Sequence, residues 1–294
     1  MTIVIAGVSG SLGRHLAQQF VSAGEEVIGI SRQNPLVEGV THISHDLRQP
    51  LTLALPKDSI VINSAAITKD GSDLCILEDN LAIANSCLEL GGIGHILVSS
   101  SSVYDLRKPT IKAKVEEANG DYPFLNAYSK SKFESETKYL ESGVASIILR
   151  PHALRGEGDQ TLLPRLKKVM RNGHLWLPNG GEAKHEFTSF TNFSRAVELS
   201  VLKFRNNWQS QVTLNVSDCK ATSIADAIHE AIAPESVLIH SIPTPLALAV
   251  GRASELRAKH GAEPRLSRYA VSQLAFDRTY DLTVTNSFLG YLAG

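Results

Sequence analysis

Short apolar runs alternate with amphipathic stretches through the first half of the chain. The runs expected to form strands are Ile3–Ala6, Glu26–Ile30, Ile60–Asn63, His95–Ser99 and Ala145–Leu149. They are mostly apolar rather than alternating, which is typical of strands covered on both faces. The stretches expected to form helices are Leu12–Ala23, Asp73–Leu90 and Asn126–Glu141. This alternation predicts an α/β fold whose parallel strands are joined by right-handed crossovers.

The pattern changes near residue 150, where prolines, glycines and short apolar pieces begin. Helical and strand patterns resume at Asn192–Phe204 and Val212–Val216, and the tail from Ile242 onward is helical in pattern. We expect a Rossmann-type, doubly wound nucleotide-binding domain and a smaller, mixed substrate-binding cap built from the second half. The expected nucleotide-binding domain comprises residues 1–150 with a later contribution from about 190–230, and the expected cap comprises residues 151–189 and 231–294.

Composition and charge narrow the class of protein. The 294 residues are 43% hydrophobic and 20% charged, which is typical of a globular protein with one large or two smaller domains. The 29 basic side chains nearly balance 30 acidic ones, so the net charge is −1. This balance gives no reason to expect a nucleic-acid partner.

Cysteine and histidine placement argues against a metal site. Cys75, Cys87 and Cys219 lack the spacing of a metal knuckle or a redox pair, and ten histidines are scattered without a zinc pattern. An odd cysteine number and a start without a signal-like segment favour a reducing cytoplasm. The least polar late stretch, Ile242–Gly251, is too short to span a bilayer, so we expect no membrane contact.

A glycine-rich turn follows the first apolar run and opens the first predicted helix. Its spacing is GxxGxxG rather than GxGxxG. Glycines there permit close backbone approach to a pyrophosphate, and the helix N-terminus supplies free N–H groups. A plain loop is the alternative, but the strand–turn–helix order favours a dinucleotide site. The cofactor-binding residues expected here are Gly7, Ser9, Gly10, Ser11, Leu12 and Gly13.

The end of the second strand indicates which dinucleotide binds. NAD-binding folds usually place a carboxylate there for the ribose hydroxyls, whereas this chain has Ser31 followed by Arg32. A guanidinium can pair with a 2′-phosphate through two hydrogen bonds. Arg14 is a candidate second phosphate partner. We therefore expect NADP(H), with NAD(H) as the alternative; the competing interpretation is that both arginines are solvated surface residues.

Two further turns follow predicted strands. In His45–Arg48, Asp46 is a candidate acceptor for the adenine amino group, with Leu47 beside it, although an Asp that caps a turn fits equally. After the fourth strand, small residues let the backbone pass close to the cofactor, although a plain strand-end turn is the alternative. These small residues are Ser64, Ala65 and Ala66.

The catalytic hypothesis depends on Tyr128 and Lys132, which lie four apart on a helical pattern and hence on one helix face. A neighbouring ammonium stabilises a phenolate and lowers the phenol pKa from about 10, which suits proton exchange with an alcohol. The serine run Ser99–Ser102 ends the fifth apolar run, where a hydroxyl can orient a substrate oxygen. The order of glycine turn, serine run and YxxxK argues against coincidence.

Together these motifs resemble the extended short-chain dehydrogenases/reductases, and more closely their 3β-hydroxysteroid dehydrogenase-like and NAD(P)-dependent epimerase/dehydratase-like branch. The motifs, which cover nearly the whole chain, are GVSGSLG, HDLR, NSAA, VSSSSVY, YSKSK, LRPHALRGEGD, HEFTSFTN, LNVSD and FLGY. The resemblance implies that Ser100, Tyr128 and Lys132 form the catalytic trio. It also implies that Tyr128 and Lys132 contact the cofactor and that Pro151 meets the nicotinamide amide.

The chain also departs from the family pattern. Ser101-Ser102 stands where sugar-nucleotide dehydratases carry an Asp-Glu pair, which argues against dehydration. Arg155 and Arg165 either face an anionic substrate or are solvated. His152 either lines the substrate pocket or is a hydrogen-bonded structural histidine.

Three functions are compatible with these residues. The favoured one is an NADP(H)-dependent oxidoreductase acting on a secondary alcohol or ketone. The alternatives are a nucleotide-sugar epimerase with tightly held cofactor and a non-catalytic NADP(H)-binding regulatory module. The expected partner is a small molecule, either a carbonyl or alcohol compound or a nucleotide sugar. Family members often dimerise through the helix that bears YxxxK, which makes a homodimer a further hypothesis.

Overall fold

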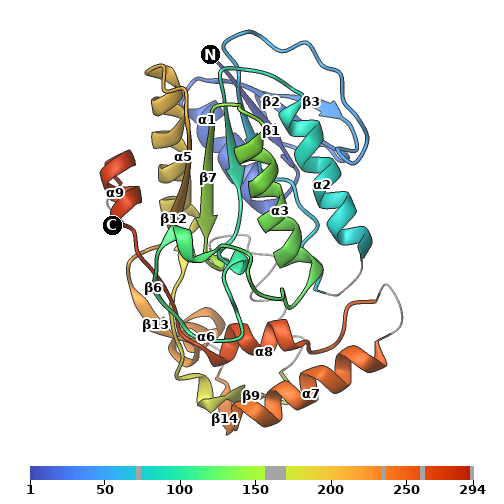
Figure 1. Cartoon of the computed structure of the whole chain (residues 1–294), viewed down its shortest axis with the longest axis vertical. Helices are drawn as coiled ribbons and strands as arrows, with labels where there is room; N and C mark the ends of the chain where they lie inside the picture. The colour runs from blue at the N-terminus through green and yellow to red at the C-terminus, as the bar shows by residue number, and fades with distance from the viewer. Residues whose placement is uncertain (71–73, 156–169, 234–235, 259–261, 292–294) are drawn as a thin grey trace.

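A computed structural model describes residues 1–70, 74–155, 170–233, 236–258 and 262–291. Its centre is a seven-stranded sheet in which all neighbouring strands are parallel (Figure 1). The strands, from one edge to the other, are β12 (Gln211–Val216), β7 (Ser146–Pro151), β5 (Gly94–Val98), β4 (Ile60–Asn63), β1 (Thr2–Ala6), β2 (Glu26–Ser31) and β3 (Val40–Ser44). The strand order reverses between β1 and β4, the point where doubly wound sheets bind ligands. The predicted α/β fold is confirmed.

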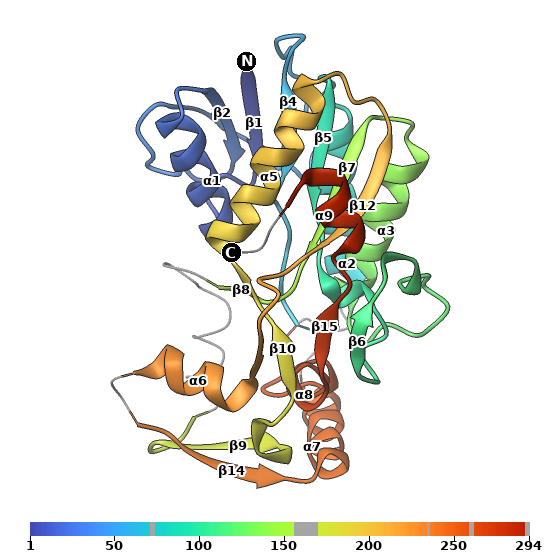
Figure 2. The same ribbon diagram turned by 90° about the vertical axis from the view of Figure 1, so that its left-hand side faces the viewer.

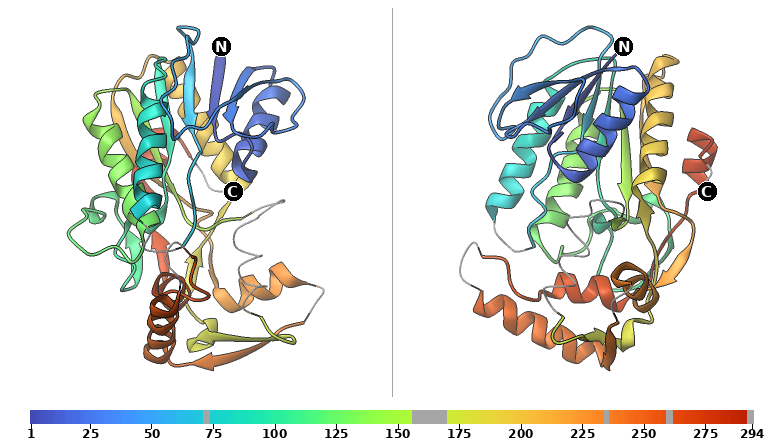
Figure 3. Two further views of the ribbon diagram at one scale, coloured as in Figure 1. Left: turned by 90° about the vertical axis from the view of Figure 1, so that its right-hand side faces the viewer. Right: turned by 180° about the vertical axis from the view of Figure 1, so that it is seen from behind.

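Helices cover both faces of this sheet. α2 and α3 lie on one face, while α1 and α5 lie on the other, with α9 packed against α5 (Figures 2 and 3). Their bounds are α1 (Ser11–Ser22), α2 (Leu74–Leu88), α3 (Ala127–Glu141), α5 (Phe190–Arg205) and α9 (Thr283–Leu289). Burial on both faces explains the continuous apolar runs of β1 and β4, whose residues are all buried.

The strands and helices expected in the first half agree with the structure to within one or two residues at each end. The predicted strand Ile60–Asn63 coincides with β4, and the predicted helix Leu12–Ala23 is α1 shifted by one residue. Asp73, the expected first residue of another helix, lies outside the described residues. The apolar pattern predicts these elements because such strands as β1 and β4 are buried throughout, whereas a helix such as α1 buries one face.

The remaining elements form a layer beyond the carboxyl ends of the sheet strands (Figure 2). Its helices are α6 (Ile224–Ile232), α7 (Thr244–Arg257) and α8 (Arg268–Ala275). Four of its strands form a sheet in the order β13 (Ala221–Ser223), β10 (Lys184–Glu186), β15 (Arg278–Tyr280) and β6 (Thr110–Ala113). The other strands form two pairs, β9 (His174–Pro178) with β14 (Leu238–Ile242) and β8 (Leu154–Arg155) with β11 (Thr188–Ser189). The four-stranded sheet is mixed, since β13 runs antiparallel to β10. No helix in the described parts of the chain is both long and apolar enough to cross a membrane.

The expected division into residues 1–150 with about 190–230, and residues 151–189 with 231–294, stays a prediction. Two segments of the chain lie in the layer opposite to the one that this division assigns to them. β6, from the first half, joins the small sheet of the second layer, while α9, near the end of the chain, packs on the central sheet layer. One buried guanidinium helps to tie the layers: Arg278 is fully buried and donates to the carbonyl oxygens of Leu106, Lys108 and Ser272. Arg278 thereby holds the loop that precedes β6 against β15.

Candidate active site

The glycine-rich turn has the shape that a pyrophosphate requires. Gly7 has a φ of 81°, and a Cβ built on it would lie 2.7 Å from the Cα of Ala65. A Cβ on Gly13 would lie 2.3 Å from the carbonyl oxygen of Gly7, so neither position accepts a side chain. Gly10 differs, because it is exposed and its Cβ would meet only one atom, at 3.3 Å. The space beside Gly10 is open for a ligand.

The first turn of α1 faces this open space without competing charges. The helix begins at Ser11, its N-terminus has no side-chain cap, and its first turn carries no acidic residue. Its first backbone N–H groups therefore lack intrahelical partners and favour an anion. The predicted residues around the turn are half-buried, namely Ser9, Ser11 and Leu12. This turn fits the pyrophosphate of a dinucleotide.

The small-residue turn after β4 lies directly beside the glycine turn. The backbone N–H and the hydroxyl of Ser64 both donate to the carbonyl oxygen of Ala6, at 3.0 and 2.7 Å. The N–H of Ala65 is bound by the Asn63 side chain at 3.2 Å. Ala66 is half-buried next to them. Two predicted cofactor segments, distant in sequence, therefore adjoin at the switch point of the sheet.

The end of β2 carries no carboxylate. Ser31 is buried, and its hydroxyl donates to the carbonyl oxygen of Gln33 at 2.7 Å and lies 3.2 Å from Nε2 of His42. Arg32 is exposed beside it. The carboxylate that would repel a 2′-phosphate in an NAD-specific site is thus replaced here by the neutral Ser31, and the cationic Arg32 lies beside it.

Asp46 lies near this cation but is held by another one. Arg48 donates to the Asp46 carboxylate at 2.6 Å and also reaches Asp79 at 3.3 Å. The hydrogen bonds from Arg48 lower the pKa of Asp46 to about 2, and the charge of Arg32 adds to this shift. An adenine amino group would therefore share the carboxylate with Arg48. Leu47 is 6% exposed and packs in the core under β1 and β2, so only its backbone is available to a cofactor.

Tyr128 and Lys132 lie on one face of α3, close to its start. The side chain of Asn126 caps the helix by accepting from the N–H of Ser129 at 2.9 Å. Lys132 is 5% exposed; its Nζ donates to the carbonyl oxygen of Val98 at 2.7 Å and lies 6.0 Å from the Tyr128 ring centroid. Burial lowers the pKa of Lys132 to about 8. An ammonium with donors to spare therefore lies near the phenol.

Ser100 follows β5 and caps the short 3₁₀ turn η1 (Ser101–Val103), against which α3 packs. Its Oγ accepts from the N–H of Ser102 at 3.1 Å. Because this bond uses an oxygen lone pair, the hydroxyl hydrogen can still be donated to a ligand. The end of β5 thus brings Ser100 and the anchor of Lys132 together, as the catalytic hypothesis requires.

A buried ion pair that sequence reasoning missed lies behind this trio. Glu136 and Arg150 have side chains only 3% and 5% exposed, and their shortest N–O distance is 2.6 Å. Glu136 also accepts from the hydroxyl of Ser99, next to Ser100. Glu136 lies one turn after Lys132, and its charge opposes the lowering of the Lys132 pKa. The sequence did carry a signal for Glu136: Tyr128, Lys132 and Glu136 are spaced four residues apart, which places all three on one face of α3.

The end of β7 and the residues that follow it, as far as β8, hold the other candidates. Pro151 is buried at the end of β7, and His152 is 3% exposed with several hydrogen bonds, which agrees with a structural histidine. Arg155 lies 3.8 Å from Asp218 and 3.6 Å from Glu230, so it already has two carboxylate partners. Arg165 lies outside the described residues.

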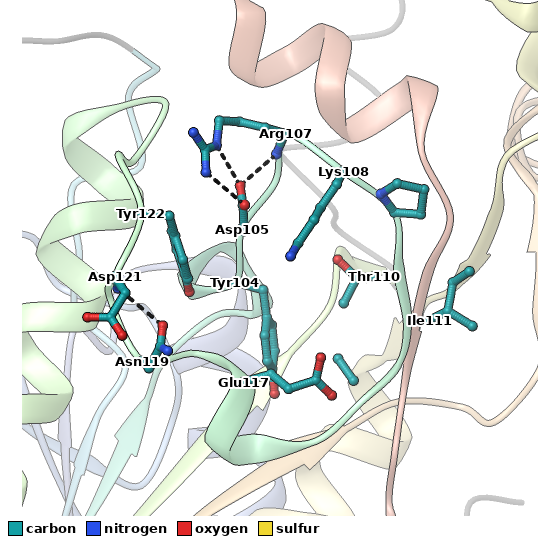
Figure 4. Close-up of a pocket in the computed structure, with 12 residues that line it drawn as sticks. Tyr104, Asp105, Arg107, Lys108, Thr110, Ile111, Glu117, Asn119, Asp121 and Tyr122 are labelled. Atoms are coloured by element: carbon teal, nitrogen blue, oxygen red, sulfur yellow. Dashed lines mark hydrogen bonds and ion pairs between the residues drawn. The ribbon is translucent and has the colours of Figure 1, made fainter.

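The segment that follows η1, from Tyr104 to Tyr122, lines a pocket of about 480 Å³. Figure 4 shows Lys108 directed into it while Arg107 turns toward Asp105. Tyr104 separates the pocket from the buried ion pair, because its hydroxyl contacts Arg150 at 3.3 Å. No motif had indicated this pocket. In the described residues, no three His, Cys, Asp or Glu side chains gather as metal ligands.

The strand order and the glycine turn at its switch point together define a doubly wound dinucleotide-binding protein. Residues 3–216 match the NAD dependent epimerase/dehydratase family, and the chain belongs to this family. The resemblance inferred from the motifs is therefore confirmed, and the chain is a member of a family of NAD(P)-dependent enzymes.

Individual relatives span most of the chain. The chain is 25% identical to the uncharacterized protein YbjS of Escherichia coli (strain K12), over 99% of this chain and 93% of YbjS. It is 28% identical to a 2-alkyl-3-oxoalkanoate reductase of Stenotrophomonas maltophilia, over 67% of this chain and 64% of the reductase. The solved structure of MoeE5 in complex with UDP-glucose and NAD superposes with a TM-score of 0.71 at 17% identity, covering 100% of this chain and 94% of MoeE5. This last likeness shows a shared fold.

Proposed function

We propose that the protein is an NADP(H)-dependent oxidoreductase that interconverts a ketone and a secondary alcohol, with Ser100, Tyr128 and Lys132 as catalytic residues. The observation that carries the proposal is the buried Lys132 ammonium, held on Val98 and facing the Tyr128 ring one helical turn away. Burying a lysine costs free energy, because burial disfavours its charged form. Such buried charged groups are frequent at active sites, where they shift the pKa of a neighbour, here the phenol of Tyr128.

In the reducing direction, a bound nicotinamide supplies the hydride to the substrate carbonyl carbon. Ser100 donates a hydrogen bond from its hydroxyl to the carbonyl oxygen, keeps its proton and holds that oxygen in place. Tyr128 donates its phenolic proton to the same oxygen as negative charge develops there. Lys132 keeps its proton at Nζ and stabilises the phenolate that Tyr128 becomes. A proton from solvent then restores the phenol.

The names of two relatives guide the choice of substrate. 2-alkyl-3-oxoalkanoate reductases of Stenotrophomonas maltophilia and Shewanella oneidensis are 28% and 24% identical to this chain. We therefore propose a ketone as the substrate class, and a 2-alkyl-3-oxoalkanoate as the first compound to assay. The test is a panel of such ketones, steroid ketones and UDP-hexoses, with NADPH and NADH consumption followed by absorbance.

The outcome of this panel separates the three functions. Ketone-dependent consumption of NADPH supports the oxidoreductase. Interconversion of UDP-hexoses without net NADPH consumption would replace it by the nucleotide-sugar epimerase. Cofactor binding without turnover of any compound would favour the non-catalytic regulatory module.

We also propose that NADP(H) is preferred over NAD(H), with Arg32 pairing the 2′-phosphate. A charge-assisted hydrogen bond contributes about 1.5–3 kcal/mol, or roughly tenfold to a hundredfold in affinity. Arg32→Ala should lose that factor for NADPH and leave NADH affinity unchanged, as measured by fluorescence titration. Arg252→Ala, which removes an exposed arginine of α7, is the matched control. Equal affinities for both cofactors in the parent protein would refute the preference.

A further inference from the structure

Two buried histidines connect the turn η1 with the four-stranded sheet of the second layer. His152 follows β7 and His185 lies on β10; they are 3% and 2% exposed. Nε2 of His152 lies 2.8 Å from Nδ1 of His185, and Nε2 of His185 lies 3.1 Å from the carbonyl oxygen of Phe276. On the other side, Nδ1 of His152 lies 2.8 Å from the Ser101 hydroxyl and 3.0 Å from the Tyr280 hydroxyl.

These contacts determine which ring nitrogens carry hydrogen. A carbonyl oxygen only accepts, so Nε2 of His185 carries the hydrogen, and Nδ1 of a neutral His185 is then an acceptor. His152 must therefore donate from Nε2, and its Nδ1 is an acceptor whose single lone pair is shared by the hydroxyls of Ser101 and Tyr280. Both rings are neutral, because burial lowers the pKa of His152 well below its usual value and that of His185 to about 3. The nearby charge of Arg278 acts in the same direction.

The hydrogen bonds from Ser101 to His152, from His152 to His185 and from His185 to Phe276 run in one direction, away from η1. Ser101 is the first residue of η1, and the preceding residue, Ser100, caps this turn. His185 lies on β10 and Tyr280 on β15, which are paired strands of the four-stranded sheet. The series ends on a backbone carbonyl, which has no proton to pass on. The arrangement is therefore a fixed support rather than a path for protons.

We propose that His152 and His185 are positioning residues, through which strands β10 and β15 hold the turn that presents the Ser100 hydroxyl to the substrate oxygen. The inference rests on the proposed function, because it takes Ser100 to bind that oxygen. Neither histidine touches the reacting atoms. They act through Ser101, whose hydroxyl is oriented by Nδ1 of His152.

The substitutions that test this role differ in hydrogen bonding and are similar in size. A glutamine at position 185 can accept from His152 and donate to Phe276, whereas a leucine can do neither. We expect His185→Leu to lower kcat for ketone reduction about tenfold or more, since misplaced catalytic groups act mainly on kcat. The Kd for NADPH, measured on the same folded preparation, should change by less than about twofold, because His185 lies on β10, outside the segments expected to bind the dinucleotide. His185→Gln should recover most of kcat.

Tyr280→Phe provides a milder variant should His185→Leu fail to fold, because it removes a single hydroxyl from Nδ1 of His152. We expect a several-fold fall in kcat with unchanged NADPH affinity. Full kcat in either His185→Leu or Tyr280→Phe would overturn the positioning role, provided that Ser100→Ala is inactive. If Ser100→Ala itself keeps full turnover, the proposed function is at fault instead.

An activity-independent measurement tests the hydrogen-bond direction. In protein labelled with ¹⁵N-histidine, the nitrogen shifts should report the Nε2–H tautomer for both His152 and His185, with no titration between pH 5 and 8. His185→Gln and His152→Gln assign the two signals. A Nδ1–H tautomer in either ring, or a titration in this range, would overturn the inference whatever the enzyme's activity.

Discussion

Replacing Glu136 by glutamine removes the negative charge of the buried ion pair while keeping the size of the side chain. Arg150 would then remain 95% buried, and its partners among the described residues would all be neutral: the new amide, the Tyr104 hydroxyl and the carbonyl oxygen of Val115. Removing one partner of a buried pair costs about 3–5 kcal/mol. At roughly 2 °C per kcal/mol for a chain of this size, the melting temperature should fall by about 6–10 °C.

The same helix supplies a matched control. Glu134 pairs with Lys130 at 3.5 Å, but both side chains are exposed, at 36% and 49%. Such a pair contributes about 0.3–0.5 kcal/mol, so Glu134→Gln should shift the melting temperature by no more than about 1 °C. Differential scanning calorimetry on both variants decides the matter. Equal shifts for Glu136→Gln and Glu134→Gln would refute the argument that burial makes the Glu136–Arg150 pair important.

Three further outcomes follow from the same physical reasoning. Burial lowers the pKa of Lys132 to about 8, so the unfolded chain binds this proton more tightly than the folded protein and the charged lysine costs stability at neutral pH. Lys132→Met should therefore abolish turnover without lowering the melting temperature. A large loss of stability in this variant would contradict the argument. Gly13→Val should unfold the glycine turn, because its side chain meets the backbone of Gly7. Gly10→Val should keep the melting temperature and lose NADPH binding, and unchanged affinity in this variant would show that the pyrophosphate lies elsewhere.

The central sheet could be predicted because its signal is local. β1 and β4 are apolar at nearly every position and buried on both faces, so a run of four or five residues carries the information. The glycine turn was equally readable, because only glycine fits at Gly7 and Gly13. The catalytic trio was likewise proposed from short motifs; the structure places Lys132 against the end of β5 and near the Tyr128 ring, and the role of the trio stays a prediction.

The second layer could not be predicted in the same way, because its strands are short and its key contacts join distant segments. β15 has three residues and lies in a tail that is helical in pattern. Tyr280 contacts His152 across 128 residues, and Arg278 reaches Lys108 across 170. His152 was recognised only as a candidate, since nothing local to it indicates that His185 is its partner.

The role of Tyr128 as the proton donor is the central claim, and one substitution isolates it. Tyr128→Phe keeps the ring and its packing and removes only the hydroxyl group. A positioned acid accelerates a reaction by about 10²–10⁴-fold, so the variant should lose that factor in kcat for a ketone that the parent protein reduces. Its Kd for NADPH should stay at the parent value, and this unchanged Kd shows that the fold and the cofactor site persist.

The decisive measurement is therefore single-turnover oxidation of bound NADPH by that ketone, followed by absorbance in the parent protein and in Tyr128→Phe. A rate reduced by about 10²–10⁴-fold in a variant that still binds NADPH is the predicted result. A rate within a few-fold of the parent's would contradict the assignment of Tyr128 and, with it, the proposed mechanism.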